Sequence, residues 1–319
     1  MSNNVRTRLE LSENGPSMPR KQSRKRKPSK KKEQVQEPKI QELDAIEAVP
    51  VEEQNIVFKP NAGPQTEFLA AGEREVLYGG SAGGGKSYAM LADPLRYMGH
   101  PSFSGLLLRH TTEELRELIF KSKEIYPQIW KGIKWSERKM QWEAPSGARL
   151  WMSYLDRDDD VLRYQGLAFS WIGFDELTQW STPYAWNYMR SRLRSTAHDL
   201  PVYMRATTNP GGPGHQWVKK MFIDPAPYGR QFDATDIESG NVLSYPKGHS
   251  KAGQALFKRR FIPARLSDNP YLSAQGDYEA MLLSLPEHQR KQLLEGDWDI
   301  KEGAAFTEFD RNIHVIEPF

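Results

Sequence analysis

The chain has 319 residues, 38% of them hydrophobic and 11% aromatic, which is enough for a folded core in one large or two smaller domains. It contains no cysteine, which excludes disulfides and cysteine-ligated metal sites, and no run of about 18 apolar residues that would predict a membrane span. The first residues lack the apolar segment of a secretion signal, so we expect a protein that is not secreted and does not enter a membrane.

The net charge of +3 hides a strong asymmetry near the N-terminus. Residues 19–32 (PRKQSRKRKPSKKK) contain nine basic residues and no acid, and residues 33–53 are rich in acids. Such a segment has little to bury, so residues 1–54 are predicted to be a disordered tail, first basic and then acidic. The basic run either neutralises nucleic-acid phosphates or is a solvated tail, and the sequence leaves both open.

From about Ile56 onward, short apolar segments alternate with segments of helical character. The predicted strands cover residues 75–80, 105–109, 170–174 and 202–207, and a predicted hairpin over 134–151 turns at Pro145, Ser146 and Gly147. The predicted helices cover residues 86–98, 112–126 and 183–194. Short buried strands between helices are typical of a parallel sheet with helices on both faces, so we expect an α/β fold.

Residues 80–87 (GSAGGGKS) match the P-loop pattern G-x-x-x-x-G-K-[ST] in full, between a predicted strand and a predicted helix. Glycines let backbone N–H groups surround a phosphate chain, and the start of the helix adds partial positive charge. We therefore expect ATP to bind at Gly80, Ser81, Ala82, Gly83, Gly84, Gly85, Lys86 and Ser87. Lys86 is expected to reach the β- and γ-phosphates and assist catalysis, and Ser87 to bind Mg²⁺.

Two further motifs follow the P-loop. In residues 171–176 (WIGFDE), Asp175 is expected to hold the water shell of Mg²⁺ and Glu176 to act as general base on the attacking water. In residues 205–210 (RATTNP), Thr208 and Asn209 are expected to sense the γ-phosphate. The alternatives are two solvated acids and an ordinary strand end, but the P-loop upstream favours the catalytic interpretation of the acids.

Together these motifs predict a RecA-like P-loop NTPase of the ASCE class, with a mostly parallel central sheet flanked by helices. The ATPase core is assigned to residues 55–230 and a small lid region that completes the domain to residues 231–300.

With the three motifs in this order, the chain resembles the large terminase subunit of tailed bacteriophages, from about Phe58 to its end. Further segments similar to that family lie at residues 209–218 (NPGGPGHQWV), 266–271 (LSDNPY), 294–298 (LEGDW), 306–309 (FTEF) and 314–315 (HV). Each of these segments is short, and it is their joint order that indicates the family.

The resemblance implies roles for further residues. Gln65, in residues 59–65 (KPNAGPQ), is similar to the family's glutamine near the adenine, although it could instead cap a helix. Arg163 is similar to the family's arginine that acts on a neighbouring subunit's nucleotide. The alternative for Arg163 is an ion pair on its own chain, and the other candidates for that role are Arg190, Arg192 and Arg194.

The resemblance also implies partners and a second domain. The expected partners are double-stranded DNA, further copies in a ring, expected to be a pentamer on the capsid, the portal protein and the small terminase subunit. Such a motor works in the host cytoplasm and transiently on the procapsid. Residues 301–319 are predicted to be a linker toward an RNase H-like nuclease domain, whose activity is not expected from this chain because Glu308, Asp310 and Glu317 lie only in its approach.

The DNA contacts of such a motor should be mainly electrostatic. The basic candidates are Lys219, Lys220, Lys258, Arg259 and Arg260, each of which could also be a solvated surface residue. Two other functions stay open: a helicase-like nucleic-acid ATPase, which needs a second RecA-like domain, and a non-enzymatic assembly module, against which the complete P-loop and acid pair argue.

Overall fold

The computed structural model describes residues 57–274 and 276–300. The chain divides into two units, Met1–Ile56 and Val57–Phe319, and every described residue belongs to the second unit. The predictions for the tail and for residues 301–319, including Glu308, Asp310 and Glu317, lie outside the described residues.

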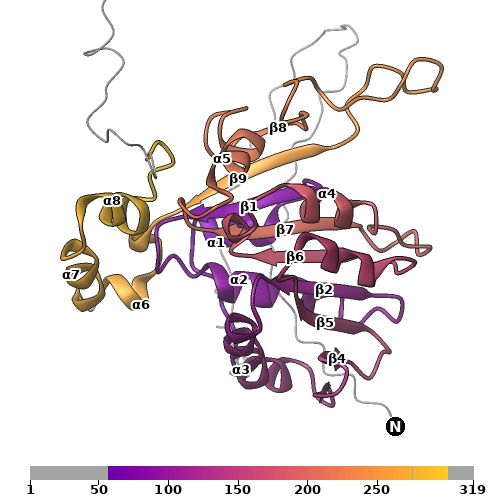
Figure 1. Cartoon of the computed structure of the whole chain (residues 1–319). Coiled ribbons are helices and arrows are strands. Elements are labelled where there is room, and N and C mark those ends of the chain that lie inside the picture. Colours follow the sequence, from indigo (N-terminus) through magenta and orange to yellow (C-terminus); the bar gives the residue numbers. More distant parts are fainter. Residues whose placement is uncertain (1–56, 275, 301–319) are drawn as a thin grey trace, which may run out of the picture. The chain divides into compact units, whose positions relative to one another are not determined.

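One mixed sheet forms the centre of the described unit, with the strand order β3-β4-β5-β2-β6-β7-β1-β9-β8 (Figure 1). Its strands are β1 (Glu75–Gly80), β2 (Ser104–Arg109), β3 (Lys134–Ser136), β4 (Gln141–Glu143), β5 (Arg149–Tyr154), β6 (Trp171–Asp175), β7 (Tyr203–Thr208), β8 (Gln231–Asp233) and β9 (Lys258–Ala264). The six strands from β5 to β9 in this order run parallel, and β3, β4 and β8 are antiparallel additions at the two edges. This architecture confirms the predicted α/β fold class.

Helices cover both faces of the sheet. The α-helices are α1 (Pro64–Ala70), α2 (Lys86–Ala92), α3 (Thr112–Ile129), α4 (Tyr184–Arg190), α5 (His215–Val218), α6 (Pro270–Ser273), α7 (Asp277–Leu283) and α8 (Glu287–Arg290). Shorter helical turns are η1 (Asp93–Tyr97), η2 (Asp158–Tyr164), η3 (Leu177–Gln179), η4 (Lys219–Ile223), η5 (Leu266–Asp268) and η6 (Lys291–Glu295). Among the described residues, no helix combines the length and the apolar character needed to cross a membrane.

A hydrophobic core lies on each face of the sheet, because side chains alternate between the two faces along each strand. Leu106 and Leu108 of β2 pack into the core that contains Trp186 of α4, whereas Leu107 packs into the core that contains Leu115 of α3. Because successive side chains of a strand point to opposite faces, a continuous apolar run fills both layers. The central strands β1, β6 and β7 are accordingly buried along their whole length.

The predicted strands are confirmed to within one residue at each end, while several helices differ in length. The predicted helix over 86–98 is an α-helix only to Ala92 and continues as the tighter turn η1, which contains Pro94. The predicted helix over 183–194 ends at Arg190. The predicted hairpin over 134–151 is a three-stranded meander, with the expected turn lying between β4 and β5.

The region after residue 230 differs from the predicted lid. β8 and β9 belong to the central sheet, and β9 pairs with β1 along its full length, from Glu75 opposite Arg259 to Gly80 opposite Ala264. The backbone of β1 has a hydrogen-bonding edge on each side, and a strand from late in the sequence fills one of them. Of the residues after 230, the segment between β8 and β9 and the segment after Ala264, which contains helices α6 to α8, lie outside the sheet (Figure 1).

The parallel strands all end at one edge of the sheet, which we call the carboxyl edge. Gly80, Arg109, Asp175, Thr208 and Ala264 are the last residues of their strands. Ligands of open α/β sheets bind at this edge, because the loops that leave the strands meet there. The fold therefore brings the three sequence motifs to one place.

Candidate nucleotide site

The P-loop connects β1 to α2 at the carboxyl edge. Gly80, Gly83 and Gly85 have positive φ angles of 140°, 78° and 75°. The left-handed conformation of Gly85 favours glycine, and a Cβ atom there would lie 2.7 Å from Nε2 of Gln65 and displace the end of that side chain.

The carbonyl groups of the P-loop are held by surrounding side chains. The carbonyl of Gly83 accepts a hydrogen bond from Asn269 Nδ2 at 2.7 Å, and that of Gly84 accepts one from the Tyr78 hydroxyl at 2.7 Å. The amide N–H groups of Gly83, Gly84 and Gly85 donate to no acceptor within the described residues. The loop thus turns its carbonyls toward the protein and keeps three backbone donors for an anion.

Lys86 ties the P-loop to the end of β7. Its side chain is buried, and Nζ donates to the carbonyl of Ser81 at 2.6 Å and to Oδ1 of Asn209 at 2.7 Å. Burial lowers the pKa of Lys86, and the negative charges of Glu176 and Asp175 oppose that shift. The ammonium group therefore lies between the loop and the acid pair.

Asp175 ends β6 and is fully buried. One carboxylate oxygen accepts a hydrogen bond from the Thr207 hydroxyl. The other oxygen, Oδ2, lies 3.1 Å from Nε of Arg109, in an ion pair whose alignment is not that of a hydrogen bond. Arg109 is not among the residues that the motifs predict for the site. It ends the apolar strand β2, and β2 is the neighbour of β6 in the sheet.

Glu176 follows in a left-handed backbone conformation, with φ of 61°. A non-glycine residue rarely adopts this conformation, and here it turns the side chain out of the strand direction. Oε2 of Glu176 accepts a hydrogen bond from the backbone N–H of Asn209 at 3.3 Å. Burial raises the pKa of Glu176, Asp175 raises it further, and Lys86 and Arg109 oppose the rise.

The two residues predicted to sense the γ-phosphate lie in different surroundings. Asn209 contacts both Lys86 and Glu176, so it bridges the P-loop and the acid pair. Thr208 is buried and its hydroxyl lies 2.7 Å from that of Thr178, away from the P-loop contacts. The geometry supports the proposed sensing role more directly for Asn209 than for Thr208.

Gln65 lies in the first turn of α1 against the P-loop. Its Nε2 donates to the carbonyl of Gly85 at 2.9 Å, and its Oε1 accepts from the backbone N–H of Asn61 at 2.6 Å. The side chain therefore fixes the loop before α1 as well as the P-loop. The predicted contact with adenine stays a prediction.

The oxygen atoms available to a cation suit magnesium. Mg²⁺ binds oxygen ligands and commonly takes only one or two from the protein, keeping waters and nucleotide oxygens for the rest. Oδ2 of Asp175 is buried and accepts no hydrogen bond from a described residue, and Ser87 lies in the first turn of the helix after the P-loop. In the part of the chain that the structure describes, no group of three or more histidine and acidic residues forms a larger metal site.

Arg163 lies on η2 and is bound within its own chain. Its Nη2 donates to the carbonyl of Tyr154 at 2.8 Å, and its guanidinium lies 3.5 Å from Oδ1 of Asp160. The side chain is 47% exposed, so it is accessible from outside. These contacts match the alternative of an ion pair on the same chain, and the action on a neighbouring subunit stays a prediction.

The other arginines proposed for that role lie elsewhere. Arg190 forms an ion pair with the buried Glu75 at the start of β1, at the opposite end of the strand from the P-loop. Arg194 donates to the carbonyls of Gly166 and Leu167, and Arg192 to the hydroxyl of Ser191. Arg190 is therefore engaged in a structural ion pair of its own chain, which argues against it as the arginine that acts on a neighbouring subunit's nucleotide.

One predicted DNA contact is wrong. Arg259 is 1% exposed and binds Glu75 at 2.7 Å, because β9 is a sheet strand whose alternate residues point into a core. Three further candidates are paired with acids: Lys258 with Asp233, Arg260 with Glu67, and Lys219 with Asp299. Lys220 is exposed.

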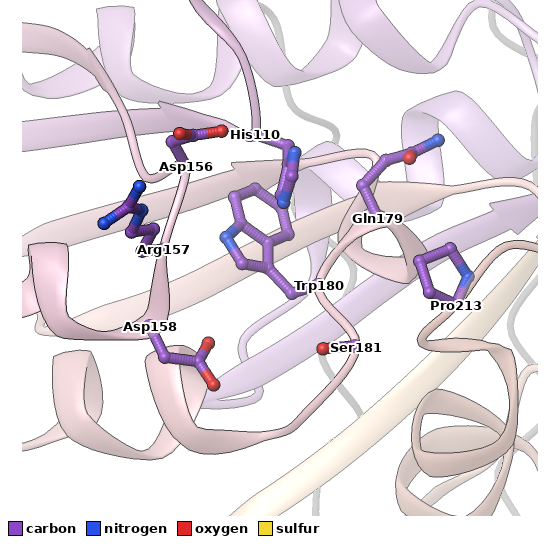
Figure 2. A pocket seen from close by; sticks show the side chains of 8 residues that line it. All are labelled: His110, Asp156, Arg157, Asp158, Gln179, Trp180, Ser181 and Pro213. Carbon is purple, nitrogen blue, oxygen red and sulfur yellow. The ribbon is translucent and has the colours of Figure 1, made fainter.

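A pocket of about 380 Å³ lies beside the nucleotide site, on the loops that follow β2, β5, β6 and β7 (Figure 2). It is lined by His110, Asp156, Arg157, Asp158, Gln179, Trp180, Ser181 and Pro213. Figure 2 shows these side chains gathered around the indole of Trp180, against which His110 packs edge to face at 5.6 Å. No P-loop residue lines this pocket, so it is a neighbour of the nucleotide site and not a part of it.

Comparison with known proteins identifies relatives of this fold. The model of the family described as terminase large subunit, T4likevirus-type, N-terminal, matches residues 77–313. The large terminase of a thermophilic bacteriophage, in complex with ADP, is similar with a TM-score of 0.54 and 18% identity, over 82% of this chain and 60% of that one. Another crystal form of the same phage terminase gives a TM-score of 0.54 at 17% identity, over 81% and 58%. No curated protein sequence matches the chain.

These solved structures share the fold with the chain. The chain spans about three fifths of the length of the thermophilic phage terminase that it matches.

Proposed function

The chain belongs to the family of T4-like terminase large subunits, in their N-terminal region, and we propose that it binds and hydrolyses ATP to move double-stranded DNA into a viral procapsid. The observation that carries the ATPase part is the meeting of three motifs at the carboxyl edge. Lys86 of the P-loop bonds Asn209, directly after β7, and Asn209 in turn bonds Glu176 beside Asp175. The terminase of the thermophilic bacteriophage was solved in complex with ADP, which supports a nucleotide as ligand.

Each residue has a distinct task in this proposal. The free amides of Gly83 to Gly85 and the ammonium of Lys86 bind the phosphates. Ser87 and Asp175 would hold Mg²⁺, which would neutralise charge on the phosphate oxygens. Glu176 accepts a proton from the attacking water, and its raised pKa brings it closer to neutral pH, where a general base is effective.

Asn209 couples the nucleotide to the rest of the molecule. The segment after it contains Gly211, whose N–H donates to Nδ1 of His215 at 2.8 Å. The His215 ring in turn stacks on Trp298 at 5.3 Å, and its Nε2 lies 3.2 Å from the Trp298 carbonyl. A change at the γ-phosphate would thus be transmitted through Asn209 to the segment that leads toward the C-terminus.

The assembly is proposed to be a ring of identical subunits on the portal of the capsid, expected to be a pentamer, with the small terminase subunit as a further partner. In this ring Arg163 leaves Asp160 and reaches the nucleotide of the neighbouring subunit. Its exposure and its position on a short helical turn are compatible with that movement. Stabilisation of the transferring phosphoryl group by such an arginine contributes about 10³–10⁵-fold in well-studied NTPases.

The test is steady-state ATP hydrolysis over a range of protein concentrations, with and without duplex DNA. We expect hydrolysis that rises faster than linearly with protein concentration, is stimulated by DNA, and is lost in both Glu176→Ala and Arg163→Ala. Arg157→Ala, on the loop just before η2, is the matched control and should retain activity. Mixing the two inactive variants should restore part of the activity, because one supplies the arginine and the other the acid.

The outcomes separate the parts of the proposal. Hydrolysis that rises linearly with protein concentration, together with normal activity of Arg163→Ala, would be compatible with the proposed ATPase. It would contradict a ring in which Arg163 acts on the neighbouring subunit's nucleotide. A hydrolysis rate that does not change when duplex DNA is added would contradict the proposed role as a DNA motor. No hydrolysis by the wild type under any of these conditions would contradict the ATPase itself.

A further inference from the structure

Arg109 is a buried cation at the nucleotide site. It ends β2, and Leu108 lies opposite Phe174 in the parallel pairing, so the next residues, Arg109 and Asp175, are neighbours. Its side chain is 11% exposed, and that of Asp175 is fully buried. Within the described residues, the guanidinium makes no ion pair or hydrogen bond besides its 3.1 Å contact with Asp175.

The charges of the site explain why a cation is needed there. Asp175 and Glu176 are consecutive acids in a largely buried place, and two close carboxylates repel each other and any approaching phosphate. Lys86 does not pair with either acid directly, because its Nζ is bound by Ser81 and Asn209. Among the described residues, Arg109 is therefore the cation within ion-pair distance of the acid pair.

The contact between Arg109 and Asp175 also leaves Oδ2 of Asp175 able to bind another cation. Nε faces Oδ2 at ion-pair distance without the alignment of a hydrogen bond, while Oδ1 is fixed by Thr207. A carboxylate oxygen held by charge alone stays open to a second cation, whereas bidentate hydrogen bonding would occupy it.

We propose that Arg109 is a positioning residue of the nucleotide site, which holds Asp175 in place and balances the charge of the acid pair before Mg²⁺ and nucleotide bind. This assignment rests on the proposed ATP-binding function. Once Mg²⁺ lies at Asp175, the metal supplies the positive charge, and the contribution of Arg109 to phosphate binding falls. The effect of removing Arg109 should therefore be large without the metal and small with it.

The experiment is titration calorimetry of a non-hydrolysable ATP analogue with the full chain, once in EDTA and once in saturating Mg²⁺. Arg109→Gln should weaken binding roughly tenfold in EDTA, the size expected for one charge at this depth, and by less than about threefold in Mg²⁺. Arg109→Lys keeps the charge and should recover most of the affinity in EDTA. Arg149→Gln, an exposed arginine at the far end of the adjacent strand β5, should match the wild type in both buffers.

Other outcomes would overturn the assignment. An equal loss in both buffers would show a direct phosphate contact or general damage, and no loss in either would show that Arg109 does not act on the site. If Arg109→Gln fails to fold, Arg109→Met takes its place as the variant without the charge, since a loss confined to EDTA supports the assignment and an equal loss in both buffers contradicts it. A wild type that binds in neither buffer would contradict the proposed function, whereas normal wild-type binding with an unchanged variant contradicts the role of Arg109 alone.

Discussion

Two buried clusters of arginine and carboxylate lie at opposite ends of the same sheet. At the amino end of β1, both oxygens of Glu75 are hydrogen-bonded, to Arg190 and to Arg259, and Arg259 also donates to the carbonyl of Thr235. At the carboxyl edge, one oxygen of Asp175 has only the misaligned ion pair with Arg109, and the adjacent Glu176 has no ion pair among the described residues.

The pKa shifts follow this difference. Burial alone would raise the pKa of Glu75, but Arg259 and Arg190 outweigh it and hold the pKa below its ordinary value. The pKa of Glu176 is instead raised, by burial and by Asp175. A cluster with every group satisfied stabilises the fold, whereas one with spare charge and spare acceptors is prepared for a ligand.

The largest effect is expected at Glu176. Glu176→Gln removes the proposed general base and keeps the shape of the side chain, so we expect the ATP turnover number to fall by about 10²–10⁴-fold while nucleotide affinity is retained. Single-turnover hydrolysis and nucleotide titration measure the two quantities separately. Turnover within about tenfold of the wild type would exclude Glu176 as the base.

At the amino end the expected effect is on stability. Arg259→Gln leaves Glu75 short of one cation in a buried site, which should cost about 3–5 kcal/mol of unfolding free energy in a urea titration. Arg260→Gln is the matched control on the same strand, where the partly exposed pair with Glu67 should contribute less than about 1 kcal/mol. Similar losses in the two variants would contradict the distinction between a buried and a surface ion pair.

A smaller effect is expected from Gln65. Gln65→Ala removes the hydrogen bond to Gly85 in the P-loop and should weaken ATP binding by about 0.5–1.5 kcal/mol, which is about two- to tenfold. Thr66→Ala, which removes another bond to the same preceding loop, is the control and should change affinity little. Equal losses would show that α1 acts only by anchoring that loop.

The pH dependence of ATP hydrolysis tests the direction in which the pKa of Glu176 is shifted. It requires no large change of the rate at neutral pH. A general base works when ionised, so activity falls as pH falls through its pKa. Since the pKa of Glu176 is raised above the ordinary 4.5, the acidic limb of the pH–rate profile should lie above pH 4.5. Circular dichroism over the same range checks that the fold persists, and a rate that is flat down to pH 4.5 would contradict the shift.

The sequence predicted the parts of the site that depend on contiguous residues. The P-loop needs glycines, a lysine and a serine in a fixed local order, and the strand before Asp175 is a short apolar run, so both could be read without a partner. Because the carboxyl ends of parallel strands meet, the fold class also predicted that these motifs come together, and the roles of the individual residues stay predictions.

What the sequence did not reveal depends on partners far along the chain. The sequence makes Arg259 either a candidate DNA contact or a solvated surface residue, whereas its partner Glu75, which lies 184 residues away, holds it in the core. The sequence of β9 contains three basic residues and Pro263, which are unusual for a central strand. It was therefore predicted as part of a lid, although it belongs to the central sheet. Arg109 looked like an ordinary residue at the end of a strand, and only the order of β2 and β6 in the sheet places it against Asp175.

The most direct test of the contrast between the two clusters is the same substitution at both. Urea unfolding of Glu75→Gln and Glu176→Gln at about pH 7 compares a carboxylate whose ionised form the fold stabilises with one whose ionised form the fold disfavours. We predict opposite signs: Glu75→Gln lowers the unfolding free energy, and Glu176→Gln leaves it unchanged or raises it. A loss of stability of similar size in both variants would contradict the account.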